Sequence, residues 1–268
     1  SRYAVLGLPI IRGVVNFGES LYIGLKTLSY SSSFYEEEDY EPGKVEQFFT
    51  KIFGDKLESV LMGITMVISV ILALGIFMVL PFFLTNLMKG FLPSYSIRTL
   101  IEGIIRVALF LIYIWLISKM EDIKRVFMYH GAEHKTINCL EHGENLTPEN
   151  IKKYSRLHKR CGTSFLLIVM IVSIVVFMFI RVDSLVWKFV LRILLVPVVA
   201  GISYEFIRLA GRSDSKIVNT LSKPGLYLQY FTTREPDEEM MEVAIKAVEG
   251  VFDWREYLRA MHNGELED

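Results

Sequence analysis

The sequence predicts an all-α, polytopic membrane protein, and three observations carry this prediction. Hydrophobic residues make up 52% of the 268 residues, and charged residues make up only 22%. The apolar residues gather in blocks, the longest of which is thirty uncharged positions from Ser59 to Met88. A helix needs about 20 apolar residues to cross a bilayer core. This composition excludes a disordered chain, a collagen-like fibre and a disulfide scaffold. The net charge of −1 indicates no nucleic-acid partner.

Four segments are apolar enough to be membrane-spanning helices, and the lipid bilayer is therefore the first expected partner. They run from about Val60 to Thr85, Thr99 to Ser118, Thr163 to Ile180 and Leu185 to Leu209. Only four residues, Arg181 to Ser184, separate the last two, which predicts a tight helical hairpin. The expected organisation is an N-terminal segment 1–58, a membrane domain 59–210 that includes a long loop 119–163, and a C-terminal tail 211–268.

The segments outside the spans have weaker patterns. Tyr3–Leu28 is apolar but is interrupted by Pro9 and Arg12, which favours an amphipathic helix at the membrane interface over a span. The acidic stretch Glu36–Glu41 is expected to be a solvated loop. In the tail, Asp237–Ala260 has the apolar spacing of one amphipathic helix.

The distribution of basic residues predicts the orientation. The loop Lys119–Cys161 contains nine Lys and Arg residues, whereas the other two loops together contain three. Cytoplasmic loops carry the excess of Lys and Arg. We therefore expect the long loop and both chain ends in the cytoplasm, where Cys139 and Cys161 are reduced thiols.

Histidines in the long loop predict a metal site. Four of the five histidines lie there, and the run Tyr129–Lys135 has the spacing H-x-x-E-H. On a helix, His130 and His134 share a face and can offer two imidazoles to one metal ion. Glu133 lies beside that face and would take a proton from a water that the metal activates, as in the inverted zincin motif. Glu141, seven residues beyond His134, and Glu205 in the fourth span are candidates for an additional acidic ligand.

A second pair of ligand types follows in the same loop. His158 and Cys161 are three residues apart, and an imidazole with a thiolate favours zinc over magnesium or calcium. His130, His134, His158 and Cys161 together make a complete set of four. If all four bind, the site is closed and structural; if one does not, a water can occupy its position, as a catalytic site requires, and the sequence leaves both interpretations open. The alternative is that the histidines are merely solvated and the cysteine fills space.

Charged residues inside the predicted spans form a second group of candidate functional residues. Glu102 and Arg106 are four residues apart, and Arg192 would reach Glu102 if the second and fourth spans pack together. Structural ion pairs are the expected role, because intramembrane charges need a partner or a wet cavity. Lys188 is expected to extend to the outer interface.

Several motifs together resemble a known family. The run from Tyr129 to Lys135, the run Arg156-Leu-His-Lys-Arg-Cys-Gly-Thr and the run from Thr232 to Pro236 resemble the YqhQ family of bacterial membrane proteins. The resemblance covers almost the whole chain and implies a multi-pass protein of the bacterial cell membrane. It also implies a metal-dependent enzyme, although that family description is itself inferred from the motif and names no substrate.

Three functions remain open on these grounds. The first is a metal-dependent hydrolase at the cytoplasmic face, with Glu133 as general base and a lipid head group or peptide as substrate. The second is a non-enzymatic scaffold or assembly factor for other membrane proteins, in which a structural metal fixes the long loop. The third is an ion or metal transporter using the intramembrane charges, which four spans without paired broken helices disfavour.

Overall fold

Helices make up all the regular structure that is described. The computed structural model describes residues 7–32, 34, 57–92, 94–182, 185–213 and 215–264, and within these ranges no strand occurs. The all-α prediction is confirmed for this part of the chain. The predicted acidic loop Glu36–Glu41 lies outside the described residues, as do Asp183 and Ser184 of the predicted hairpin turn.

The chain divides into two compact units. The first comprises Ser1–Leu109 and Ile174–Gly201, and the second comprises Phe110–Ser173 and Ile202–Asp268. The long helices α5 (Tyr95–Ile117), α8 (Gly162–Met178) and α9 (Leu185–Arg212) contribute to both units.

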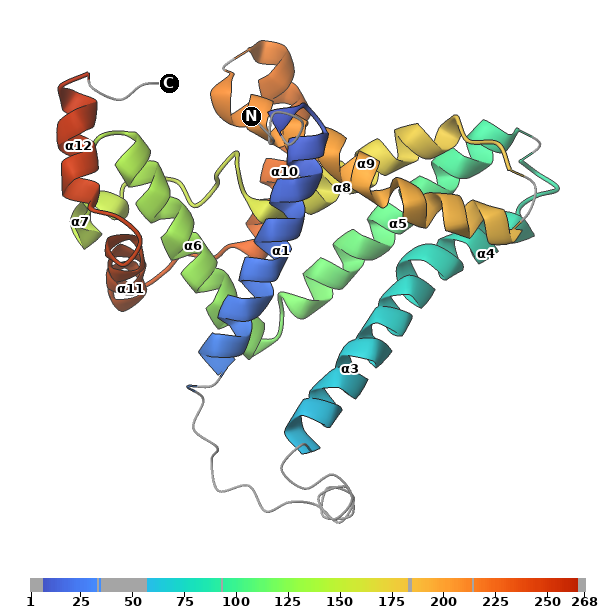
Figure 1. Cartoon of the computed structure of the whole chain (residues 1–268), viewed down its shortest axis with the longest axis horizontal. Helices are drawn as coiled ribbons and strands as arrows, with labels where there is room; N and C mark the ends of the chain where they lie inside the picture. Colours follow the sequence, from blue (N-terminus) through green and yellow to red (C-terminus); the bar gives the residue numbers. More distant parts are fainter. Residues whose placement is uncertain are drawn as a thin grey trace. The chain divides into compact units, whose positions relative to one another are not determined.

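The first unit contains the apolar helices at the start of the predicted membrane domain. Besides its parts of α5, α8 and α9, it contains α1 (Ile11–Ser32), α3 (Leu57–Leu74), the π-helix η3 (Gly75–Val79) and α4 (Leu80–Leu87) (Figure 1). Among the described residues, three helical stretches are long and apolar enough to cross a membrane, namely Gly63–Leu87, Tyr95–Ile117 and Val186–Arg212. They correspond to the first, second and fourth predicted spans.

The helix at the third predicted span is shorter than a bilayer-crossing helix usually is. It corresponds to α8, which is strongly apolar but contains 17 residues. At 1.5 Å per residue such a helix is about 25 Å long, whereas the hydrocarbon core is about 30 Å thick. The count of four spans therefore stays a prediction. The predicted N-terminal helix is present as α1, which exposes Leu21, Leu25 and Leu28, and its placement at the interface also stays a prediction.

A proline shapes the first span. Pro81 has no N–H group, so it cannot donate to the carbonyl of Phe77 four residues earlier. At this point the helix widens into η3, and the Nε of Arg106 donates to the Phe77 carbonyl oxygen at 2.8 Å. A charged side chain from α5 thus donates to the carbonyl group to which Pro81 cannot donate.

Glu102 is the centre of the ionic contacts in the first unit. Its carboxylate is 2% exposed and accepts hydrogen bonds from Arg106 at 3.1 Å, from Lys188 at 3.3 Å and from both terminal nitrogens of Arg192. Arg106 lies one turn along α5, and the other two cations come from α9. The expectation that Lys188 extends outward was wrong, because its ammonium group turns inward to this carboxylate.

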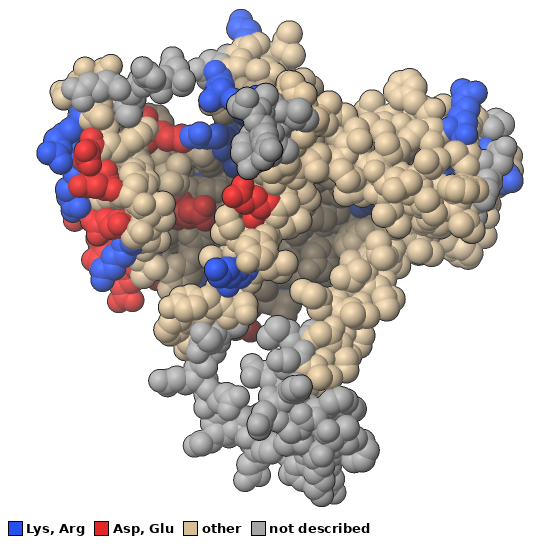
Figure 2. All heavy atoms as spheres, viewed as in Figure 1, with Lys and Arg blue, Asp and Glu red and all other residues tan. Residues whose placement is uncertain are grey.

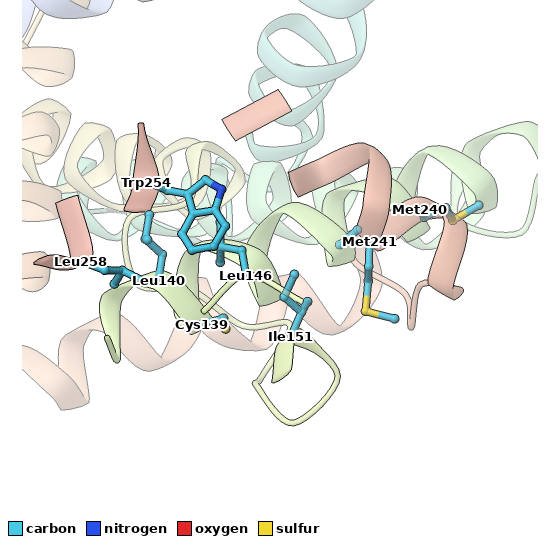
Figure 3. Packing of buried hydrophobic residues seen from close by; sticks show 9 residues of the cluster. Cys139, Leu140, Leu146, Ile151, Met240, Met241, Trp254 and Leu258 are labelled. Atoms are coloured by element: carbon cyan, nitrogen blue, oxygen red, sulfur yellow. The ribbon is translucent and has the colours of Figure 1, made fainter. Parts of the chain in front are cut away.

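The second unit has its own hydrophobic core. Its helices α6 (Glu121–Glu141), α7 (Pro148–Ile151), α11 (Glu238–Glu249) and α12 (Trp254–His262) pack around Leu140, Ile151, Met241 and Trp254, and α10 (Lys216–Thr232) also belongs to this unit (Figure 3). Cys139 is fully buried in this core, and burial raises the pKa of its thiol to about 11. Cys139 is therefore a packing residue.

The tail differs from the single predicted helix. Two helices, α11 and α12, replace Asp237–Ala260, because the chain turns after Gly250. Asp253 then begins α12 by accepting hydrogen bonds from the backbone N–H groups of Arg255 and Glu256. The prediction was wrong at this point because the apolar spacing continues across the turn. It also overlooked α10, whose last residue contributes to the site described next.

Candidate metal centre

The helix α6 places the two motif histidines together. His130 and His134 are one turn apart, and their ring centroids are 4.3 Å apart. Residues four apart on a helix share a face, so the spacing alone accounts for this arrangement. His134 is buried and His130 is half-buried.

Backbone carbonyl groups fix the orientation of both rings. The Nδ1 of His130 lies 2.7 Å from the carbonyl oxygen of Thr232, and the Nδ1 of His134 lies 2.6 Å from that of Arg156. A carbonyl oxygen can only accept, so each Nδ1 carries the proton and donates it. Each neutral ring then has its lone pair on Nε2, which is the tautomer that a metal-ligating histidine needs.

Cys161 completes a group of three potential ligands. It directly precedes α8, where the N–H of Thr163 donates to its sulfur at 3.4 Å, and its Sγ is 3.3 Å from the Nε2 of His130. One ligand atom from each of His130, His134 and Cys161 lies within 4.8 Å of the others. A tetrahedral zinc ion, with Zn–N of about 2.0 Å and Zn–S of about 2.3 Å, holds nitrogen and sulfur about 3.5 Å apart. The separation between Cys161 and His130 is close to this value, and the three residues could hold a metal ion.

The electrostatics of the cluster favour a thiolate. Burial raises the pKa of Cys161, but contacts with His130, His134 and Thr163 outweigh burial and lower that pKa to about 5. Burial lowers the pKa of His130, but Cys161 and the Thr232 carbonyl outweigh it and raise that pKa. The anionic sulfur that zinc requires is thus the stable form at neutral pH.

Two of the predicted ligands pair with each other beside this cluster. The Nε2 of His158 lies 3.2 Å from the Glu141 carboxylate, which also accepts a hydrogen bond from Arg160. The ring centroid of His158 is 5.8 Å from that of His134. Burial lowers the pKa of His158, and the charges of Cys161 and Glu133 partly offset this. The structure brings neither His158 nor Glu141 into the group of three.

The two remaining predicted residues lie outside the group of three as well. Glu133 is exposed on α6, where it lines an apolar groove, and its charge contributes to the raised pKa of His130. Glu205 is half-buried on α9 and belongs to the same unit as the cluster.

A buried glutamine holds the chain next to Cys161. The side chain of Gln229 in α10 accepts a hydrogen bond from the N–H of His158 at 2.8 Å and donates to the His158 carbonyl oxygen at 2.7 Å. It also lies 2.6 Å from the hydroxyl of Ser164 in α8. Because Gln229 is fully buried, these contacts fix the path of the loop into Cys161. Sequence reasoning missed this residue, since a lone glutamine carries no motif.

The segment after α10 supports the site from the other side. Arg156 donates to the carbonyl and hydroxyl oxygens of Thr233, and Glu235 lies 3.0 Å from Lys135 and 3.4 Å from Arg156. This segment passes very close to Gly131, because a Cβ at Gly131 would lie 1.9 Å from the Arg234 carbonyl oxygen. The run from Thr232 to Pro236 was noticed in the sequence only as a family motif, and the structure gives it a supporting role.

Comparisons with known proteins agree with these motifs. A family model described as "Protein of unknown function (DUF1385)" matches residues 8–254. The chain is 37% identical over 241 residues to "Uncharacterized protein YqhQ" of Bacillus subtilis (strain 168), and this alignment covers 90% of the chain and 76% of the relative. No solved structure matches the chain. The chain therefore belongs to the DUF1385 family, as its resemblance to YqhQ predicted.

Proposed function

We propose that this protein is a membrane-bound, metal-dependent hydrolase that works at the cytoplasmic face of the bacterial cell membrane. One observation carries the proposal. His130, His134 and Cys161 gather ligand atoms within 4.8 Å of one another, and both imidazoles are held by backbone carbonyls in the ligating tautomer. Two imidazoles and a thiolate suit zinc, and three protein ligands leave one coordination position open for catalysis.

Glu133 is the general base in this proposal. It follows Ala132 on the same helix turn as the two histidines, and it is exposed, so water can reach it. Its carboxylate would accept a proton from the attacking water, while the metal supplies Lewis-acid chemistry. The groove beside Glu133 has a volume of about 430 Å³ and is lined mainly by apolar residues, including Ile137, Val248 and Phe252. Such a lining fits an acyl chain or an apolar peptide segment, which supports a lipid or a membrane-proximal peptide as substrate.

The competing proposal is a scaffold with a structural metal, and the contacts around Cys161 favour it. His134, Asn138 and Lys135 of α6 all donate to backbone carbonyls of the segment Lys152–Leu157. A metal bound by Cys161, four residues beyond this segment, would add a further link between the loop and α6 and would supply folding free energy directly. In a scaffold that docks a partner membrane protein, the metal site would only have to stabilise the loop and would need no catalytic activity.

Replacement of Glu133 by Gln separates the two proposals. The Gln side chain keeps the size but cannot accept the proton, so a hydrolase would lose on the order of 10²–10⁴-fold in rate. The variant should fail to complement a strain that lacks the protein, while its metal content and melting temperature remain those of the wild type. Glu121→Gln is the matched control, because Glu121 is also an exposed carboxylate on α6.

The outcome for each proposal is distinct. Full complementation by Glu133→Gln would exclude the hydrolase. If the metal is structural, Cys161→Ser should instead lose both metal and thermal stability, and the loss of cellular function should follow the loss of folded protein.

A further inference from the structure

The first unit contains a polar pocket that has no part in the metal centre. It lies where the turn after α4 meets the start of α5 and has a volume of about 170 Å³. Its polar lining includes Thr85, Lys89, Arg98, Thr99, Glu102 and Lys188. All of these residues belong to the first unit, which contains the candidate span Gly63–Leu87 and parts of the other two candidate spans. A charged side chain within a membrane span costs free energy unless another group pairs with it.

Positive charge is in excess around this pocket. Among the described residues, Lys89, Arg98 and Lys188 contribute three cations to the lining, and Glu102 contributes the one carboxylate. Both oxygens of Glu102 are already engaged by Arg106, Lys188 and Arg192. Its single negative charge is therefore shared among several cations. On the face drawn in Figure 2, basic side chains are visible at the end where Figure 1 places the turn between α4 and α5.

Among the described residues, two buried polar atoms in the lining lack hydrogen-bond partners. They are the hydroxyl of Thr99, a residue that is 3% exposed, and the Nε of Arg98. An unsatisfied buried donor costs about 1–3 kcal/mol, so native structures rarely retain one without a reason. The two residues are adjacent on α5, and both line the pocket.

We propose that this pocket binds a phosphate anion, carried either by a phospholipid head group or by a soluble phosphate ester. Phosphate offers several acceptor oxygens at once, which would satisfy Arg98 and Thr99 and would balance Lys89 and Lys188. Exposed apolar side chains flank the pocket in sequence, including Leu87, Met88 and Phe91. This surface supplies contacts for acyl chains if the phosphate belongs to a lipid. The proposal does not depend on the metal or on hydrolysis.

The experiment uses the purified full-length chain in dodecyl maltoside micelles, which contain no phosphate. In one arm, phosphatidylglycerol or, as its control, diacylglycerol is mixed into the micelles, and the lipid retained by the protein is counted by native mass spectrometry. In the other arm, the micelles contain no added lipid, and inorganic phosphate is titrated against chloride at equal ionic strength with the melting temperature as readout.

Two pocket variants and one control make the test specific. Arg98→Gln should weaken binding about ten- to a hundredfold, and Thr99→Val, which keeps the shape of the side chain, about three- to tenfold. Arg181→Gln removes an equal charge from an exposed residue outside the pocket lining and should leave binding unchanged. Specific retention of phosphatidylglycerol would identify a lipid, and stabilisation by inorganic phosphate would identify a soluble ester.

Two results would overturn the proposal. One is that neither phosphatidylglycerol nor inorganic phosphate binds the wild-type protein in preference to its control. The other is that Arg98→Gln and Thr99→Val bind the anion as tightly as the wild type does. The anion would then be attracted by the surface of the protein and would not be held in the pocket. The wild-type comparison of phosphate with chloride decides the question even if Arg98→Gln fails to fold.

Discussion

Replacing Gly131 by Ala tests the structural basis of the candidate metal centre. The new Cβ would lie 1.9 Å from the Arg234 carbonyl oxygen, whereas real Cβ contacts essentially never fall below 3.0 Å. Backbone on one side or the other must therefore move by at least about 1.1 Å, the difference between these two distances. Overpacking of this kind costs about 1–3 kcal/mol. The movement would also strain the hydrogen bond from the Arg234 N–H to the Phe127 carbonyl, which is 2.8 Å long.

The same movement should reach the metal site. The Thr232 carbonyl that orients His130 lies two residues before Arg234, so a displaced segment releases the His130 ring. Loss of such an orienting partner reduces metal affinity about ten- to a hundredfold. Gly162→Ala is the matched control, because Gly162 follows Cys161 directly and its added Cβ would meet nothing within 4 Å.

The assay measures zinc affinity by competition with a chelator, together with thermal melting in detergent. Gly131→Ala should melt at a lower temperature and bind zinc more weakly, while Gly162→Ala should match or exceed the wild type in stability. Wild-type melting and zinc affinity in Gly131→Ala would refute the close approach of the Thr232–Pro236 segment to α6.

Three further predictions concern separate groups. His158→Ala should retain the metal, because His158 pairs with Glu141 outside the three-ligand cluster, and elemental analysis showing an empty site would restore His158 as a ligand. In metal-free protein, thiolate absorbance should rise in two steps, near pH 5 for Cys161 and near pH 11 for Cys139; because a thiol is ionised above its pKa, Cys161→Ala should remove only the lower step. Glu102→Gln should lower the free energy of unfolding by about 3–5 kcal/mol, because it leaves buried cations uncompensated. Glu121→Gln serves as the exposed control, and equal melting of the two variants would show that the Glu102 contacts are not stabilising.

Local periodicity explains why some of the candidate site could be predicted. His130 and His134 come together through helix geometry alone, which any helix with that spacing imposes. Helix periodicity could not predict that Cys161, and not His158, joins the two histidines. Both lie in one short segment, and their positions depend on Gln229, which holds the His158 backbone, and on Glu141, which pairs with the His158 ring. These contacts join residues far apart in the chain.

The sequence by itself determined the helical class, three apolar stretches long enough to cross a membrane, the resemblance to a family, and the histidine pair. Each of these depends on composition, on motif order or on the repeat of a single helix, so it can be read from neighbouring residues. Only the tertiary structure decided that Cys161 joins the histidines, that Thr232 orients His130, and that Lys188 turns inward to Glu102. The physical reason is that a metal ligand set and a buried ion cluster depend on distances between separate elements, and packing, not local propensity, sets those distances.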